Sequence, residues 1–444
     1  GNITESPIIF DDGEAMQSLA GIADYILTNN REIVVPQDDS VIQFSMDHRQ
    51  KIVIRRARGM APAFGTFKPS AAFDEPLLAM GAMLKSTFGI YHQNRIFISQ
   101  YLSNTETLDS QENFEKVLDH FSLVLDFHPA RILVDMHPDY PSTVLGDQCG
   151  RELDIPVIPV QHHEAHAYSV LGENGLLDAD DVLCVIWDGT GFGHDHQIWG
   201  GEFFLYRNYS LSRLGHWSCF DHLGGDRMAR EPRLPLLSLL SVDHMMTDQV
   251  RHKFTPVEYD NYIRLLQKGR LKTTSTGRLF DAVASILEIS DQNTYEGEAA
   301  MYLEAEAQEK YMRDPEFDKF YEPKFREKNI PDIQGLIREI FRDYRNGKTG
   351  RGEIALKFHL TLVKFIKKIA EDHQVSCLAF SGGVFQNGLL IDLIHRELDG
   401  RCRLYFQRDL SPNDENISYG QLMGYYVHKK RIESLNHIEN RVLR

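Results

Sequence analysis

The sequence predicts an α/β protein with mostly parallel strand pairing. Short apolar runs typical of buried strands alternate with amphipathic stretches typical of helices, most clearly over 354–428. Apolar residues make up 42% of the chain and charged residues 25%, which is ordinary for a globular protein with a packed core. The length of 444 residues is enough for two or more domains.

The expected strands are short apolar runs that end at turn-forming residues. They cover 32–35, 41–45, 51–56, a run that opens at Leu77, 132–136, 155–160, 183–187, 202–207, 376–380 and 403–406. The expected helices cover 12–30, 112–127, 165–171, 354–370, 386–399 and 417–428, with more helix over 226–272 and helices that begin near 277 and 295. Residues 313–350 are charge-rich and are expected to be an exposed helical excursion. Prolines, glycines and small residues over 61–74 indicate a linker.

Charge and cysteine usage exclude several classes of protein. The net charge of −16 disfavours a free-standing nucleic-acid binder or a protein that binds anionic membranes. No apolar run approaches the ~18 residues of a membrane span. The five cysteines are scattered and never form C-x-x-C, which argues against a disulfide framework or a zinc ribbon and suits the reducing cytosol. We therefore expect a cytoplasmic protein.

A pair of histidines suggests metal binding. His162 and His166 follow a predicted strand, and their spacing of four places them on one face of a helix. Two neutral imidazoles at that spacing can bind one divalent metal if two further ligands come from elsewhere. An isolated H-x-x-x-H is more often an ordinary histidine cluster. The metalloprotease pattern is excluded, because Ala167 stands where it requires histidine.

Further polar groups follow predicted strands. Asp188 opens D-G-T-G, Ser381 opens S-G-G before a helix, and Asp414 lies in the loop after the last strand. Ligands of open α/β sheets gather at the carboxyl ends of strands, so these groups favour a shared site. Glycines before a helix N-terminus can bind phosphate. A tight turn that needs glycine only for steric reasons fits that motif equally well.

Six ordered motifs resemble the carbamoyltransferase HypF family of nickel–iron hydrogenase maturation. They are V-Q-H-H-x-A-H at 160–166, D-G-T-G-x-G at 188–193, G-R-L-F-D-A-V-A at 277–284, Y-E-G-x-A-A-M at 295–301, S-G-G-V-F-Q-N at 381–387 and P-N-D-x-x-I-S-x-G at 412–420. The resemblance covers most of 52–430. The matching part of HypF is similar to the tRNA threonylcarbamoyl-transferase TsaD and to the antibiotic carbamoyltransferase TobZ. It implies a two-lobed actin/hexokinase-like fold with a nucleotide between the lobes.

The resemblance also implies a domain division. Residues 1–60 resemble the end of a YrdC-like domain, 61–74 a linker, and 75–444 the TsaD-like carbamoyl-transfer domain. The acylphosphatase-like domain, the paired zinc fingers and most of the YrdC-like domain of HypF have no counterpart in the sequence. The chain is therefore expected to be a fragment of a longer protein or a truncated relative.

Family roles carry over residue by residue. The ligands of an iron or zinc ion match His162, His166, Asp188 and Asp414. The nucleotide site matches Gly189, Gly191, Gly382, Gly383 and Asn387, with Asp281 and Glu296 near the ribose and Lys85 at the carbamoyl-phosphoryl end. Glu164 stands where relatives often have histidine, and Trp187 and the residues 194–196 are less typical.

The implied reaction has two stages. A YrdC-like site makes carbamoyl adenylate from carbamoyl phosphate and ATP, and the second site passes the carbamoyl group to the C-terminal cysteine thiol of HypE, on the way to the cyanide ligands of the hydrogenase. Two alternatives stay open. A tRNA threonylcarbamoyl-transferase-like enzyme is disfavoured by the acidic balance and the YrdC-like tail. A kinase or ATPase of the same fold would need a catalytic carboxylate and usually magnesium.

Overall fold

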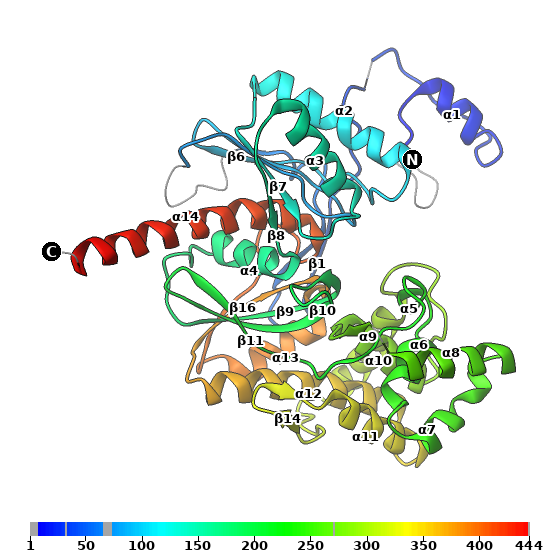
Figure 1. Ribbon diagram of the computed structural model, residues 1–444. Helices are drawn as coiled ribbons and strands as arrows, with labels where there is room; N and C mark the ends of the chain where they lie inside the picture. The colour runs from blue at the N-terminus through cyan, green and yellow to red at the C-terminus, as the bar shows by residue number, and fades with distance from the viewer. Residues whose placement is uncertain (1–7, 32, 65–72, 270, 443–444) are drawn as a thin grey trace.

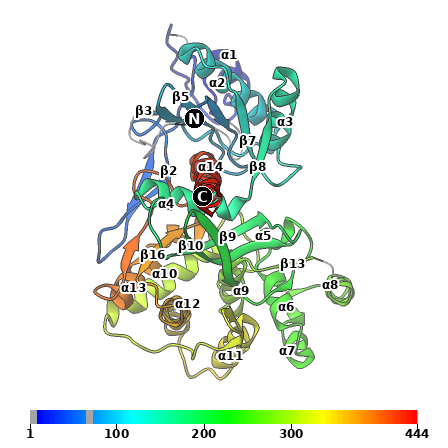
Figure 2. The same cartoon turned by 60° about the vertical axis from the view of Figure 1, so that its left-hand side comes forward.

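The computed structural model describes residues 8–31, 33–64, 73–269 and 271–442. These residues form two lobes, each built on a mixed β-sheet (Figure 1). Helices α4 (His162–Glu173) and α14 (Ile417–Val442) lie between the two sheets, as a second view confirms (Figure 2). Among the described residues, no helix is both long enough and apolar enough to cross a bilayer.

The upper lobe in Figure 1 holds a six-stranded sheet in the order β3-β6-β5-β4-β7-β8. Its strands are β3 (Ala63–Phe64), β4 (Leu77–Ala79), β5 (Gly89–His92), β6 (Arg95–Ile98), β7 (Arg131–Asp135) and β8 (Val157–Val160). Helices α2 (Leu108–Leu125) and α3 (Pro141–Leu153) cover one face, and α14 packs on the other. Leu78 of β4 joins the core under α2, whereas Leu77 faces α14, because successive side chains of a strand point to opposite faces.

The lower lobe holds a seven-stranded sheet in the order β12-β13-β10-β9-β16-β17, with β11 paired to β10. Its strands are β9 (Val182–Phe192), β10 (Ile198–Arg207), β11 (Ser210–His216), β12 (Phe220–Asp221), β13 (Lys272–Thr273), β16 (Cys377–Ser381) and β17 (Arg403–Tyr405). Cys184 and Ile186 of β9 face the core around α4 and α14, and Val185 and Trp187 face the opposite core. This burial on both faces explains the continuous apolar run in the sequence.

Helices cover the other face of the lower sheet and extend beyond it (Figure 1). They are α5 (Arg227–Arg230), α6 (Arg233–Leu240), α7 (His244–Gln249), α8 (Pro256–Lys268), α9 (Thr276–Ile286), α10 (Glu298–Arg313), α11 (Ile333–Arg345), α12 (Arg351–Asp372) and α13 (Gly388–Leu398). The structure also contains a small hairpin, β14 (Phe325–Glu327) and β15 (Ile330–Pro331), and the 3-10 turns η1 (Arg251–Lys253), η2 (Gly383–Gln386) and η3 (Asp414–Asn416).

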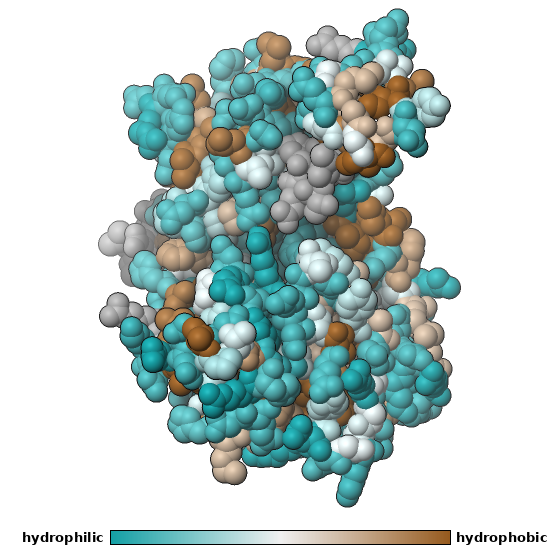
Figure 3. Space-filling model, turned by 90° about the vertical axis from the view of Figure 1, so that its right-hand side faces the viewer, coloured by the Kyte–Doolittle hydropathy of each residue, from teal (hydrophilic) through white to brown (hydrophobic). Residues whose placement is uncertain are grey.

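The N-terminal segment consists of α1 (Asp12–Ser18) and the hairpin of β1 (Val41–Phe44) and β2 (Lys51–Arg55). The hairpin is followed by the buried Arg56, whose guanidinium donates to the carbonyls of Ile98 and Ser99 in the upper lobe. Several large apolar side chains of this segment are exposed, including Tyr25 and Leu27. Figure 3 shows hydrophobic side chains gathered near the top of the face on which α1 lies.

Strand pairing corrects one prediction, because both sheets are mixed and not mostly parallel. Strands β4, β5 and β6 form consecutive antiparallel hairpins, and so do β9, β10 and β11. Their connections are too short for the crossover that a parallel pair requires. Parallel pairing is found where helices intervene, as in β4 with β7 and β9 with β16.

Local elements differ from the expectations in four places. The helix expected over 12–30 ends at Ser18, since none of its residues is buried and a lone short helix is marginal. Residues 33–35 form no strand. The strand expected over 183–187 does not end before the D-G-T-G motif, because β9 continues through the motif to Phe192 and pairs with β10. The excursion 313–350 is not simply exposed, since Ile333, Ile337 and Ile340 of α11 are buried against the lower core. Most of the expected linker, 65–72, lies outside the described residues.

Candidate metal centre and glycine loop

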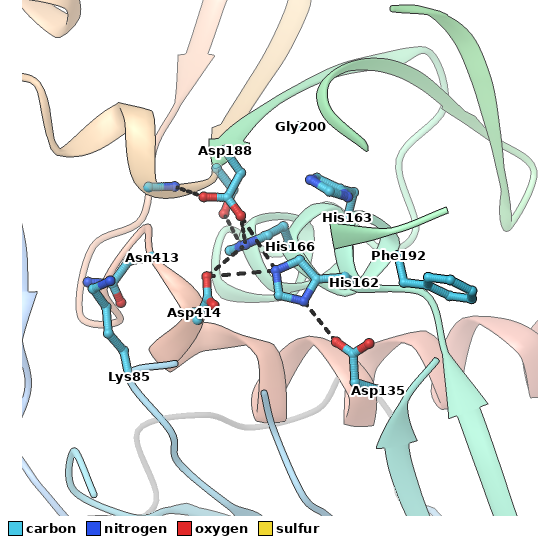
Figure 4. Close-up of polar contacts among 12 residues, drawn as sticks. Lys85, Asp135, His162, His163, His166, Asp188, Phe192, Gly200, Asn413 and Asp414 are labelled. Atoms are coloured by element: carbon cyan, nitrogen blue, oxygen red, sulfur yellow. Dashed lines mark hydrogen bonds and ion pairs between the residues drawn. The ribbon is translucent and has the colours of Figure 1, made fainter. Parts of the chain in front are cut away.

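Four predicted ligands converge between the lobes (Figure 4). His162 and His166 come from α4, Asp188 from β9 and Asp414 from η3. The Nε2 atom of His162 lies 3.5 Å from Asp188 Oδ2 and 3.7 Å from Asp414 Oδ1. The Nε2 atom of His166 lies 3.6 Å and 3.7 Å from the same two oxygens. Two nitrogens and two oxygens therefore surround one point.

Local structure explains the convergence. Gln161 caps α4 by accepting the backbone N–H of Glu164, so the helix begins at His162 and both imidazoles project from one face. Asp188 lies opposite an irregularity in β10, where the pairing register shifts between Trp199 and Gly201. Asp188 is therefore held inside a strand, not at a strand end as the sequence suggested.

The donor set fits a metal ion. Both imidazoles are buried, and neither Nε2 atom has a hydrogen-bond partner among the described residues. Their distances to the carboxylates exceed those of hydrogen bonds. A buried nitrogen without a partner costs free energy unless something binds it. Two histidines and two aspartates match the ligand preferences of zinc and of non-haem iron.

Charges of opposite sign are concentrated at this point. Burial lowers the pKa of His162, but the carboxylates of Asp414 and Asp135 outweigh burial and raise it well above its usual value. The pKa of His166 is also raised, because its carboxylate partners outweigh burial. Burial opposes ionisation of the two ligand carboxylates too, yet the imidazoles hold the pKa of Asp188 well below its usual value and that of Asp414 at about 2. A cation would therefore compete with the imidazole protons for these carboxylates.

Asp135 and Asn416 orient the two histidines, and neither was predicted from the sequence. The Asp135 carboxylate lies 2.8 Å from Nδ1 of His162, and the side-chain oxygen of Asn416 lies 3.0 Å from Nδ1 of His166. Asp135 is the last residue of β7, so the same strand-end argument that selected the other aspartates was available for it.

The glycines of the predicted phosphate loop lie beside this cluster. Gly382 has φ +102°, and a Cβ atom there would lie 2.2 Å from the carbonyl oxygen of Trp187, so no other residue fits. The N–H of Gly383 donates to Asp188 Oδ1 at 3.1 Å. A Cβ atom on Gly189 would meet nothing within 4 Å, whereas one on Gly191 would collide with the His163 ring. Gly189 therefore borders open space, whereas Gly191 is required because its backbone packs directly against the His163 ring.

Two other predicted nucleotide residues have their side chains engaged within the protein. The oxygen of Asn387 caps α13 by accepting the N–H of Leu390, and its amide nitrogen lies 3.1 Å from His359 Nε2. Asp281 is buried and accepts from Arg278 at 2.7 Å, and burial raises its pKa. These contacts fix both side chains within the protein, and their roles in nucleotide binding stay a prediction.

Lys85 and Glu296 form an ion pair between the lobes. The Lys85 ammonium lies 2.6 Å from the Glu296 carboxylate, which stands just before α10. Burial lowers the pKa of Lys85, but Glu296 and then Asp414 outweigh burial and raise it. Figure 4 shows Lys85 beside Asn413 and Asp414. The lysine is thus charged and close to the cluster.

Comparison with known proteins identifies relatives over nearly the whole chain. Residues 72–173 match the family model "HypF Kae1-like domain", and residues 184–421 match "Carbamoyltransferase, Kae1-like Domain, second subdomain". Carbamoyltransferase HypF of Synechocystis is 35% identical over 95% of this chain and 56% of its own length. Probable carbamoyltransferase HypF of Methanocaldococcus jannaschii is 32% identical over 96% and 56%. The chain therefore spans just over half the length of these curated relatives.

Two solved structures share the fold. Full-length HypF in a phosphate- and nucleotide-bound form gives a TM-score of 0.86 at 29% identity, over 96% of this chain and 66% of that one. HypF from T. kodakarensis gives 0.86 at 30% identity, over 97% and 57%. Together with the two sheets described above, these matches confirm the predicted two-lobed α/β fold.

Proposed function

The chain belongs to the carbamoyltransferase HypF family, and from this premise we propose that it transfers a carbamoyl group during hydrogenase maturation. The donor is carbamoyl adenylate, made from carbamoyl phosphate and ATP, and the acceptor is the C-terminal cysteine thiol of a HypE-type protein. The observation that carries the proposal is the cluster of two histidines and two aspartates, three of them buried, beside the glycine loop.

The proposed reaction balances as an acyl transfer. The thiolate sulfur of the partner attacks the carbamoyl carbon, a C–S bond forms, and the bond from that carbon to the phosphate oxygen of AMP breaks. The products are the S-carbamoyl cysteine and AMP, and the thiol proton passes to solvent. Because the nucleophile belongs to the partner, none of the five cysteines of this chain is required for catalysis.

His162, His166, Asp188 and Asp414 would hold an iron or zinc ion. A metal bound there would supply Lewis acidity toward a carbamoyl or phosphate oxygen. The residues themselves orient the reactants, because His162, His166 and Asp188 are buried and each is fixed by a hydrogen bond to a neighbouring group.

The nucleotide is proposed to bind between the lobes, beside Gly189, Gly382 and Gly383. The free space at Gly189 supports this assignment. The full-length HypF structure that shares the fold was described with phosphate and nucleotide bound. Lys85 is proposed to meet the carbamoyl-phosphoryl end of the donor, which requires it to exchange Glu296 for the incoming anion.

A division of labour follows from the N-terminal segment. Three arginines of this segment are candidates for a phosphate contact, but each donates to a backbone carbonyl of this chain: Arg55, Arg56 and Arg58. We therefore expect the chain alone to form no carbamoyl adenylate from carbamoyl phosphate and ATP. Supplied with the preformed adenylate, it should still carbamoylate the partner.

The test is mass spectrometry of a HypE-type partner after incubation with the chain and carbamoyl adenylate. We expect the mass of one carbamoyl group on the terminal cysteine. Asp414→Ala should lose the transfer, whereas Asp409→Ala should retain it, since the Asp409 side chain is exposed and pairs with Lys51. An unmodified partner, or equal transfer by Asp414→Ala, contradicts the proposal.

A further inference from the structure

Asp135 is a buried carboxylate for which the proposed reaction gives no role. It is the last residue of β7, and its side chain is inaccessible to solvent. One carboxylate oxygen accepts the backbone N–H of His137 at 2.9 Å, which fixes the orientation of the group. The other lies 2.8 Å from Nδ1 of His162.

This contact determines which nitrogen of His162 carries the proton. A carboxylate accepts hydrogen bonds, so Nδ1 of His162 donates to Asp135 and Nε2, which faces Asp188 and Asp414, is the nitrogen that can bind an ion. The ring is thereby oriented so that Nε2 becomes the ligand once an ion displaces its proton.

A neutral group, the Asn416 amide, orients His166 in the same way. The amide nitrogen of Asn416 donates to the carbonyl of Ser411 at 2.8 Å, so the amide oxygen must face Nδ1 of His166. The two imidazoles therefore have the same tautomer. Nδ1 of His162 donates to a negatively charged carboxylate, whereas Nδ1 of His166 donates to a neutral amide. A carboxylate behind an imidazole increases the basicity of the ligating nitrogen more than an amide does.

We infer that Asp135 is a positioning residue of the metal site, which acts through His162 and makes it the stronger of the two imidazole ligands. The inference rests on the proposed metal site. Asn at position 135 would keep the volume but could turn its NH₂ group toward Nδ1, and it would then stabilise the tautomer whose Nε2 carries a proton and cannot bind a metal.

The experiment compares zinc affinities of the full chain by competition with a chromophoric chelator. Asp135→Asn should bind Zn²⁺ roughly 10–100-fold more weakly than the unmodified protein. Asp139→Asn, an exposed aspartate in the following loop, is the matched control and should bind normally. The visible absorption of the Co²⁺-loaded protein should also shift in Asp135→Asn, because the field of one nitrogen ligand weakens. Should Asp135→Asn fail to fold, Asp135→Ser carries the same test.

A double-mutant cycle separates positioning from general destabilisation. The cycle compares the residual affinity of the weakened sites at added zinc: in a His162→Ala background, Asp135→Asn should cause no further loss of zinc affinity, whereas in a His166→Ala background the full loss should persist. Equal losses in both backgrounds, or unchanged affinity in Asp135→Asn, overturn the inference. If the unmodified protein binds no zinc or iron at all, the metal part of the proposed function fails instead.

Discussion

The crossing of α4 and α14 makes Gly420 a sensitive position. A Cβ atom at Gly420 would lie 1.9 Å from the carbonyl oxygen of Ala165 and 2.5 Å from its carbonyl carbon. Both atoms are helix backbone and cannot rotate away, so Gly420→Ala must push the helices apart by roughly 1 Å. Overpacking of a core costs about 1–3 kcal/mol, and this rigid contact belongs at the upper end. Alanine recovers ~1 kcal/mol of helix propensity, which leaves a net loss of about 2 kcal/mol.

Urea denaturation followed by circular dichroism measures this loss. Gly350→Ala, at the N-cap of α12, is the control without a steric clash, because a Cβ atom there meets nothing within 4 Å. His162 and His166 lie on α4 near Ala165, so displacement of α4 should move both imidazoles. The variant should therefore also bind zinc more weakly. The reasoning is refuted if Gly420→Ala is as stable as Gly350→Ala and binds zinc as tightly as the unmodified protein.

Three further predictions concern the cluster, the glycine loop and a buried acid. His162→Ala and His166→Ala should each lose the bound metal while circular dichroism stays unchanged, and full metal occupancy in both by elemental analysis would contradict the ligand assignment. Gly383→Val should weaken ATP and AMP binding in calorimetry. It should also weaken metal binding, because its Cβ atom would lie 3.0 Å from Asp188 Oδ1. Unchanged nucleotide affinity would show that the loop does not bind the phosphate. Burial raises the pKa of Glu304 to about 7, so the folded state holds a proton that the unfolded state has released, and stability should fall as pH rises from about 4.5 to 7. Glu304→Gln should reduce the fall in the free energy of unfolding between these pH values, as measured by denaturation. An unchanged fall would show that other groups cause the pH dependence.

Residues in regular local structure were the most predictable from the sequence. The spacing of His162 and His166 fixes their common helix face, and the structure brings both together with Asp188 and Asp414. The alternation of strands and helices after residue 354 likewise predicts β16, α13, β17 and α14 in order.

Features that depend on pairing with distant residues could not be predicted. The D-G-T-G motif has the composition of a turn, and only its register with β10 keeps it extended. The engagement of Asn387 depends on His359, which comes from a different helix. The pairing of Asp281 with Arg278 is different, since a spacing of three on a helix was visible in the sequence.

We propose that a metal ion and a nucleotide phosphate meet between the lobes. An anomalous difference map from crystals of the chain grown with AMP, recorded at the iron and zinc absorption edges, tests it most directly. The account predicts one strong peak bounded by Nε2 of His162 and His166 and by the carboxylates of Asp188 and Asp414, with the phosphate next to Gly382. No peak within that cluster, or a phosphate bound elsewhere, would contradict the account.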